Sequence, residues 1–342
     1  MKNHFSIFSV LFLLLVFSVA PVRAQEEEPM KFLFIGNSYT YMNDMPGLFE
    51  KMAKKSGKNV LVEKNTKGGA SFQSHTGRDD MFEAIRKRKW DYVVLQGFSR
   101  EMSFQPNHID SASVPYIQQI LDSIYYNNAC THVRFYMTWG YDDGFKEREE
   151  VDTYDKMADS IRKGYEWIGS KFGLPVVPAG MVWREVRNNK GIDLYYKDRA
   201  HPNLSGSYTI AATFFSAFFD EPLRDNYIPR MKNRYARKIN KVAFNYVAEH
   251  RAKYHLDDYL FHFEVEKKRD LYEVKYKSLY PDASLQWYVN DSLVSSDDTG
   301  TIYLQDIEDK QLTLKVTRAC GSREYKRILW NYNKKAIRRR ED

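Results

Sequence analysis

Short apolar runs alternate with helix-patterned stretches from residue 31 to residue 220, and this alternation constrains the fold more than any other feature. Uninterrupted apolar runs are typical of parallel strands buried on both faces, and the crossovers between such strands are usually helices. The pattern therefore predicts an α/β domain whose parallel sheet is flanked by helices. The expected strands cover residues 31–35, 60–62, 92–95, 133–137 and 174–177.

Amphipathic helices are expected between and after these strands. One of them should begin directly behind Asn203, because an asparagine at this position can accept N–H bonds from the first helical turn. Another amphipathic stretch, at 231–253, extends the domain beyond the last strand. The expected helices cover residues 46–57, a stretch around 81–85, and residues 109–126, 151–172, 204–219 and 231–253.

The hydrophobic period changes near Asp257. Beyond it apolar residues alternate with polar ones, and turn pairs such as Asn290–Asp291 separate the alternating runs. An alternation with period two predicts strands with one buried face, so residues 258–333 are expected to form a small antiparallel β-sandwich. The neighbours Trp287 and Tyr288 should point to opposite faces, and one of them is a candidate platform for stacking on a sugar. A domain that only packs against its neighbour is the preferred alternative.

The first 24 residues have the organisation of a secretory signal peptide. Lys2 supplies a positive start, residues 8–20 are almost wholly apolar, and Val22 and Ala24 place small side chains before the expected cleavage site. The apolar run is short for a membrane-spanning helix, so an N-terminal anchor is the less favoured alternative. We expect cleavage after Ala24, a secreted or periplasmic protein, and no stable insertion into the membrane afterwards.

The positive charge of the chain is concentrated in two places. The net charge is +7, and basic residues gather at 230–241 and in the tail at 334–342. Binding to an acidic polymer is one interpretation, but a solvated helix face and a frayed terminus are the favoured one. Nucleic acid is not an expected partner for an exported protein.

The cysteine and histidine content excludes several classes of site. Two cysteines are too few for a disulfide framework, a cysteine-based zinc site or an iron–sulfur cluster. Cys130 and Cys320 fall in different predicted domains, where a disulfide is one option in an oxidising compartment. Two buried free thiols are the favoured prediction. The remaining histidines are scattered, so no metal and no cofactor is expected.

Two polar blocks at the ends of the α/β pattern suggest nucleophilic catalysis. Ser38 lies in Gly-Asn-Ser-Tyr-Thr, directly after the first expected strand, and ligands bind at the carboxyl ends of parallel strands. A serine hydroxyl needs a base within hydrogen-bond reach, and that base needs an orienting partner. Asp198 and His201, in Asp-Arg-Ala-His-Pro-Asn before a helix, supply such a pair. The sequence thus predicts Ser38, His201 and Asp198 as catalytic residues.

Two further segments are candidates for stabilising an oxyanion. Residues 67–71 follow the second expected strand, and Gly69 there can aim a bare backbone N–H at a developing negative charge. Residues 96–99 follow the third expected strand, and either the Gln96 amide or the Ser99 hydroxyl can donate. Each segment alone is also compatible with an ordinary turn.

Taken together, these four segments resemble the blocks of the SGNH hydrolase (GDSL-like) superfamily over residues 31–220. The resemblance is greatest to a secreted Bacteroidetes-type branch with a Gly-Asn-Ser-Tyr-Thr first block. It implies a flavodoxin-like α/β/α sandwich that hydrolyses esters without a cofactor. It also implies that Ser38 is the nucleophile and first oxyanion donor, that Gly69 is the second donor, and that His201 is the base oriented by Asp198.

The third block departs from the superfamily pattern. It usually reads Gly-x-Asn-Asp, with an asparagine that donates to the oxyanion, whereas residues 97–100 read Gly-Phe-Ser-Arg. Gln96 is the preferred substitute for the missing donor. Asn37, Ser99 and Trp139 are candidate substrate contacts, since all three fall in segments expected at the same edge of the sheet.

The resulting prediction is a secreted serine esterase with a catalytic domain at 25–257 and an accessory β-sandwich at 258–333. The resemblance and the export signal suggest an acylated glycan as substrate, with acetyl as the expected acyl group, although other small esters fit the same chemistry. A non-catalytic glycan-binding protein on a degenerate hydrolase fold is the main alternative, favoured by the missing asparagine. A lipase or thioesterase is another, and no residue pattern indicates an oligomeric state.

Overall fold

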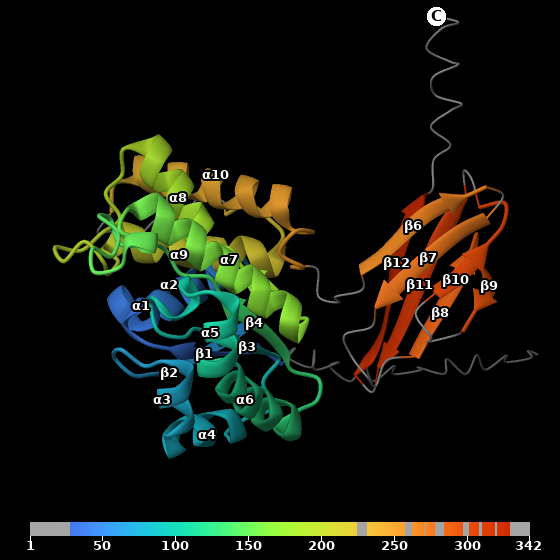
Figure 1. The fold of residues 1–342 in the computed structure, drawn as a ribbon, viewed down its shortest axis with the longest axis horizontal. Coiled ribbons are helices and arrows are strands. Elements are labelled where there is room, and N and C mark those ends of the chain that lie inside the picture. Colours follow the sequence, from blue (N-terminus) through green and yellow to red (C-terminus); the bar gives the residue numbers. More distant parts are fainter. Residues whose placement is uncertain are drawn as a thin grey trace, which may run out of the picture.

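The computed structural model describes residues 28–223, 231–256, 262–269, 271–277, 284–296, 301–307, 310–318 and 320–328. The expected signal peptide with its cleavage site, the predicted boundary at Asp257 and the basic tail lie outside these residues. Within them the chain folds into an α/β domain followed by two antiparallel sheets (Figure 1).

A five-stranded parallel sheet forms the centre of the α/β domain. Its order is β2-β1-β3-β4-β5, and every neighbouring pair is parallel. This is the flavodoxin-like order of a doubly wound sheet, so the predicted fold class is confirmed. The side chains of β3 are buried throughout, which explains why the strand reads as an apolar run. The strands are β1 (Met30–Gly36), β2 (Val60–Thr66), β3 (Tyr92–Leu95), β4 (His132–Tyr136) and β5 (Val176–Val177).

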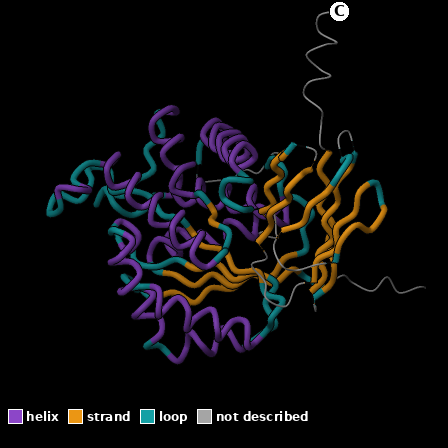
Figure 2. Tube along the Cα trace, turned by 45° about the vertical axis from the view of Figure 1, so that its right-hand side comes forward, coloured by secondary structure: helices purple, strands orange, loops and turns teal. Residues whose placement is uncertain are grey.

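Helices cover both sides of this sheet (Figures 1 and 2). One group packs around α9 and consists of α2 (Met45–Lys55), α8 (Ala179–Lys190), α9 (Leu204–Phe219) and α10 (Asn233–His250). A second group packs around α6 and consists of α3 (Phe72–Thr76), α4 (Asp79–Arg86), α5 (Pro106–Ala112) and α6 (Val114–Asn127). The long helix α7 (Tyr154–Phe172) contacts α5, α8 and β5. The short elements are α1 (Ser38–Tyr41), η1 (Met42–Asp44), η2 (Glu101–Ser103) and η3 (Glu149–Val151).

Two helix predictions are wrong in detail. The single helix expected at 109–126 is divided at Ser113 into α5 and α6, because Pro115 in the first turn of α6 cannot continue a preceding helix. Helix α8 was not predicted from the sequence. Its apolar stripe is too short to predict a helix from the sequence. In the structure its apolar residues are buried because α8 packs against α9. The predicted cap of α9 is confirmed, since the Asn203 side chain accepts the Gly206 N–H at 3.0 Å.

The C-terminal region forms two antiparallel sheets with a hydrophobic core of their own, as predicted (Figure 2). The sheet orders are β10-β7-β6 and β12-β11-β8-β9. Trp287 is fully buried at the centre of this core, so it is not available as a stacking platform, whereas its neighbour Tyr288 is half-buried. The strands are β6 (His262–Lys268), β7 (Leu271–Lys277), β8 (Ser284–Val289), β9 (Ser292–Ser295), β10 (Thr301–Leu304), β11 (Gln311–Arg318) and β12 (Gly321–Ile328).

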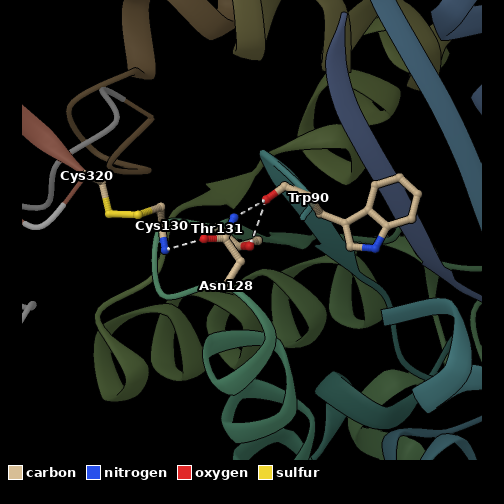
Figure 3. Close-up of a disulfide and its surroundings, with 5 residues drawn as sticks. All are labelled: Trp90, Asn128, Cys130, Thr131 and Cys320. Carbon is tan, nitrogen blue, oxygen red and sulfur yellow. Dashed lines mark hydrogen bonds between the residues drawn. A yellow bond between two sulfur atoms is a disulfide. The ribbon is translucent and has the colours of Figure 1, made fainter. Parts of the chain in front are cut away.

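A disulfide between Cys130 and Cys320 joins the two regions (Figure 3). The prediction of two buried free thiols is therefore wrong. Cys320 lies exposed in the turn between β11 and β12, and the fold brings it to the half-buried Cys130 just before β4. The Asn128 side chain fixes the segment that carries Cys130. It accepts the Cys130 N–H at 3.1 Å and donates to the Trp90 carbonyl, also at 3.1 Å. The link sits at the amino ends of the parallel strands.

None of the helices in the described part of the chain is both long enough and apolar enough to cross a membrane.

Candidate active site

The Ser38 block forms the turn between β1 and α1. Asn37 is the N-cap of α1, and its side-chain oxygen accepts the Tyr39 N–H at 3.0 Å. Its amide nitrogen donates to the carbonyls of Ala70 at 3.0 Å and Gly97 at 2.9 Å. Because every polar atom of this buried side chain is engaged, Asn37 joins three loops instead of contacting a substrate, which corrects its predicted role.

The structure brings Ser38, His201 and Asp198 together at the carboxyl edge of the sheet. The Ser38 hydroxyl lies 2.8 Å from His201 Nε2, and His201 Nδ1 lies 2.6 Å from a carboxylate oxygen of Asp198. With the proton on Nδ1 donated to Asp198, Nε2 is free to accept the serine proton. Ser38 is nearly buried, with 8% of its surface exposed.

Asp198 is held in its ionised form. Partial burial by itself would raise the pKa of Asp198, but the backbone N–H groups of His201 and Ala200 and the His201 imidazole together lower it. The carboxylate is thus available to orient the imidazole and to stabilise the imidazolium that forms when His201 takes a proton.

The loop that carries Asp198 and His201 is clamped to the loop after β4. Arg199, between them, has a left-handed backbone with φ +59° and pairs with the Asp142 carboxylate. Asp142 also accepts from Arg187 Nε at 2.8 Å, and its N–H donates to the Arg199 carbonyl at 2.9 Å. Burial alone would raise the pKa of Asp142, but the two guanidinium groups lower it. This partly exposed ion-pair cluster, with its additional hydrogen bonds, fixes the backbone next to both catalytic residues.

An aromatic stack supports the imidazole from behind. The rings of Tyr39 and Trp139 are stacked at 4.2 Å, those of Trp139 and Trp183 also at 4.2 Å, and the Tyr39 ring meets His201 edge-on at 5.4 Å. Trp139 is fully buried, and its indole N–H donates to the Ala200 carbonyl at 3.1 Å. The prediction that Trp139 contacts a substrate is therefore wrong: it packs beneath the site.

Two backbone N–H groups are candidates for the oxyanion hole. No acceptor for the Ser38 or Gly69 N–H is found among the residues that the structure describes. Gly69 has φ +69°, a conformation that a residue with a side chain rarely adopts, and its segment is tied to the Ser38 block through the Ala70 carbonyl. This arrangement suits the predicted donor role of both groups.

The two side chains predicted from the third block are differently placed. Gln96 is fully buried; its oxygen accepts from the Asn37 N–H and the Thr40 hydroxyl at 2.9 Å each, and its nitrogen donates to the Gly97 carbonyl. This replaces its predicted donor role with a structural one. Ser99 is nearly buried, and its hydroxyl lies 2.8 Å from that of Tyr141, which is half-buried.

Sequence reasoning missed Glu101 and the pairing partners of Asp142. Glu101 follows the third block and is buried with no cation paired to it among the described residues, a feature that its polar neighbours in the sequence do not signal. Asp142 follows the predicted site residue Trp139 by three positions, but its partners lie 45 and 57 residues further along the chain. No group of three or more His, Cys, Asp or Glu side chains suited to a metal ion occurs within the described ranges.

The sheet order, with Ser38 after β1 and His201 before α9, gives the chain the flavodoxin-like fold that the sequence resemblance implied. No protein-family model matches the sequence, and no curated protein shows significant similarity to it.

Among solved structures, the fold is similar to that of a DUF4886 family protein from Bacteroides uniformis. The match has a TM-score of 0.57 and 21% identity, and covers 65% of this chain and 95% of the other. A candidate SGNH hydrolase from Slackia heliotrinireducens matches with TM-score 0.45 and 21% identity over 54% of this chain and 96% of the other. An acetyl-xylooligosaccharide esterase variant from Geobacillus matches with TM-score 0.42 and 16% identity over 58% and 98%. The last two likenesses are too weak to bear on activity.

Proposed function

We propose that the protein is an exported serine esterase that hydrolyses acyl esters, with acetylated glycans as its substrate class. The single observation that carries the proposal is the continuous hydrogen-bonded path from Ser38 through His201 to Asp198, with contacts of 2.8 and 2.6 Å. Export follows from the signal-like residues 1–24, and the glycan from the motif resemblance together with export.

The proposed reaction has two steps. His201 accepts the Ser38 proton as the serine oxygen attacks the ester carbonyl, and the imidazolium then protonates the departing alcohol. The N–H groups of Ser38 and Gly69 stabilise the oxyanion at each tetrahedral stage. In the second step water, deprotonated by His201, attacks the acyl-enzyme and releases the acid, and the Ser38 hydroxyl is restored.

The test is acetate release from a chromogenic acetyl ester by the mature protein and by Ser38→Ala. Removal of the nucleophile should lower kcat by about 10⁴-fold or more. Ser111→Ala, which changes a surface serine on α5, is the matched control and should keep the wild-type rate. A fluorophosphonate probe should label the wild type and the control but not Ser38→Ala.

Negligible turnover and no labelling of the wild type would contradict the proposal and favour a non-catalytic glycan-binding protein. Acyl chain length separates the remaining alternatives. An acetylesterase should lose kcat/KM as the chain grows from two to eight carbons, whereas a lipase or thioesterase should gain it.

A further inference from the structure

Glu101 is a buried carboxylate that the proposed reaction does not use. It follows the third block in η2, is 9% exposed, and is contacted by no cation among the described residues. Its partners are three neutral donors: the Phe98 N–H at 2.7 Å, the Ser113 hydroxyl at 2.9 Å and the Phe72 N–H at 3.3 Å. A buried charge is costly unless it is hydrogen-bonded, so these donors determine where the carboxylate sits.

Two of these donors lie in segments next to the oxyanion donors: one is near Gly69, and the other is in the third block, which contacts Asn37 beside Ser38. Phe72 follows Gly69 by three residues, and Phe98 lies in the third block. Glu101 therefore bridges the N–H groups of both segments. Asn37 bridges the same segments through their carbonyls, at Ala70 and Gly97. The two loops are thus linked twice. The Asn37 amide binds their carbonyl groups, and the Glu101 carboxylate binds their N–H groups.

Glu101 lies close to Gly97 of the third block. A Cβ atom on Gly97 would lie 2.3 Å from Glu101 Oε2 and 2.6 Å from the Phe72 ring. The carboxylate is thus packed directly against the backbone of the third block.

We infer that Glu101 is a positioning residue, which holds the Gly69 segment and the third block in the relative position that oxyanion stabilisation requires. The inference rests on the proposed esterase function. Oxyanion donors act because they are fixed before charge develops, and not because they bind the uncharged ester more tightly. Loosening them should therefore lower kcat and leave KM nearly unchanged.

The charge of Glu101 suits this role at neutral pH. Burial raises the pKa of Glu101 to about 6, while the Phe98, Ser113 and Phe72 donors act to lower it. Tyr165 of α7 is a titratable group near the carboxylate, and burial keeps its hydroxyl neutral by raising the pKa of Tyr165. Glu101 is thus ionised at pH 7 and can accept from all three donors.

The test compares Glu101→Gln with Ser113→Ala. The glutamine keeps the side-chain volume but places an amide NH2 group against N–H donors. Ser113→Ala instead removes a partner of Glu101 that belongs neither to the Gly69 segment nor to the third block. In Glu101→Gln we expect kcat to fall about 10- to 100-fold with KM within threefold. Backbone amide exchange in residues 68–72 and 97–99 should accelerate about tenfold or more, with exchange in β1 and β3 unchanged. Ser113→Ala should change kcat and these exchange rates by less than about threefold.

The inference is overturned if Glu101→Gln exchanges as slowly as the wild type in both segments, or if its kcat loss equals that of Ser113→Ala. If Glu101→Gln fails to fold, Glu101→Asp replaces it. The shorter carboxylate should give a smaller loss of kcat. Backbone amide exchange at the wild-type rate in both segments would again refute the inference. A wild-type protein without esterase activity contradicts the proposed function alone, because amide exchange still decides whether Glu101 holds the two segments.

Discussion

Cys130 and Cys320 are joined by a disulfide although 190 residues separate them, and their Cα atoms lie 5.5 Å apart. Cys130 precedes β4, so the link attaches the C-terminal sheets at the amino edge of the parallel sheet. Ser38 and His201 lie at the opposite, carboxyl edge. The C-terminal region is therefore tethered away from the catalytic groups.

The double variant Cys130→Ser/Cys320→Ser should lose stability but not activity. The disulfide closes a long loop and so lowers the entropy of the unfolded chain. In the chain-entropy model this adds about 5 kcal/mol at most to the free energy of unfolding. Denaturant unfolding with and without reductant measures the loss, and the double variant should be insensitive to reductant. Turnover of a small acetyl ester should stay within twofold of the wild type. A tenfold loss of kcat would show that the tether acts on the catalytic edge.

Asp198→Asn should lower kcat by about 10²- to 10⁴-fold, because the amide favours the wrong imidazole tautomer and cannot stabilise the imidazolium. Steady-state kinetics on an acetyl ester gives the loss. Asp193→Asn is the control, since Asp193 pairs with Arg199 on the same loop at 3.2 Å but has no contact with the imidazole. If Asp198→Asn retained more than a tenth of the wild-type kcat, His201 would not depend on Asp198 for its orientation.

Asp142→Asn should lower kcat about tenfold with little change in KM. The substitution removes the charge that holds Arg199 and Arg187, so the loop carrying Asp198 and His201 loses its clamp, and small displacements of catalytic groups are costly. Asp143→Asn, at the exposed neighbouring position, is the matched control and should behave as the wild type. Equal rates in the two variants would assign the Asp142 cluster to stability alone.

Trp139→Ala should destabilise the protein by about 3–5 kcal/mol, because it removes the central ring of the stack between Tyr39 and Trp183. Trp167→Ala, at a partly buried position on α7, should cost clearly less in the same urea titration. The milder variant Trp139→Phe tests for a substrate contact. A KM for a glycan ester that rises while stability stays unchanged would contradict the packing role.

Acidification from pH 6.5 to pH 4 should destabilise the protein through His75. Burial lowers the pKa of His75 from 6.5 to about 4, with the charge of Arg78 acting in the same direction. The folded state thus holds the imidazole neutral. The stability that this gives is fully present above pH 6.5 and is lost as the pH falls toward 4, where the free energy of unfolding should be lower by about 3 kcal/mol. His75→Phe should show a flatter pH dependence of unfolding than the wild type or the exposed-site control His108→Phe. Parallel curves for all three proteins would exclude His75 as the cause.

The position of the main catalytic candidates could be predicted because they follow from chain order. A serine directly after β1 and a histidine directly before α9 must meet, since both lie at the carboxyl edge of one parallel sheet. The roles of Gln96 and Trp139 could not be predicted in this way. Each lies in a loop at the correct edge, but whether a loop side chain points outward or inward depends on partners from other segments, here Asn37 and Ala200.

The α/β class, the change to strand periodicity near Asp257 and the blocks that carry the nucleophile and its base could all be predicted without a structure. Hydrophobic periodicity and turn residues are local properties of the chain. The Cys130–Cys320 pairing, the formation of α8 and the burial of Glu101 beneath the third block became evident only in the folded protein. These features depend on contacts between segments that are far apart in sequence, and packing, not local preference, selects such contacts.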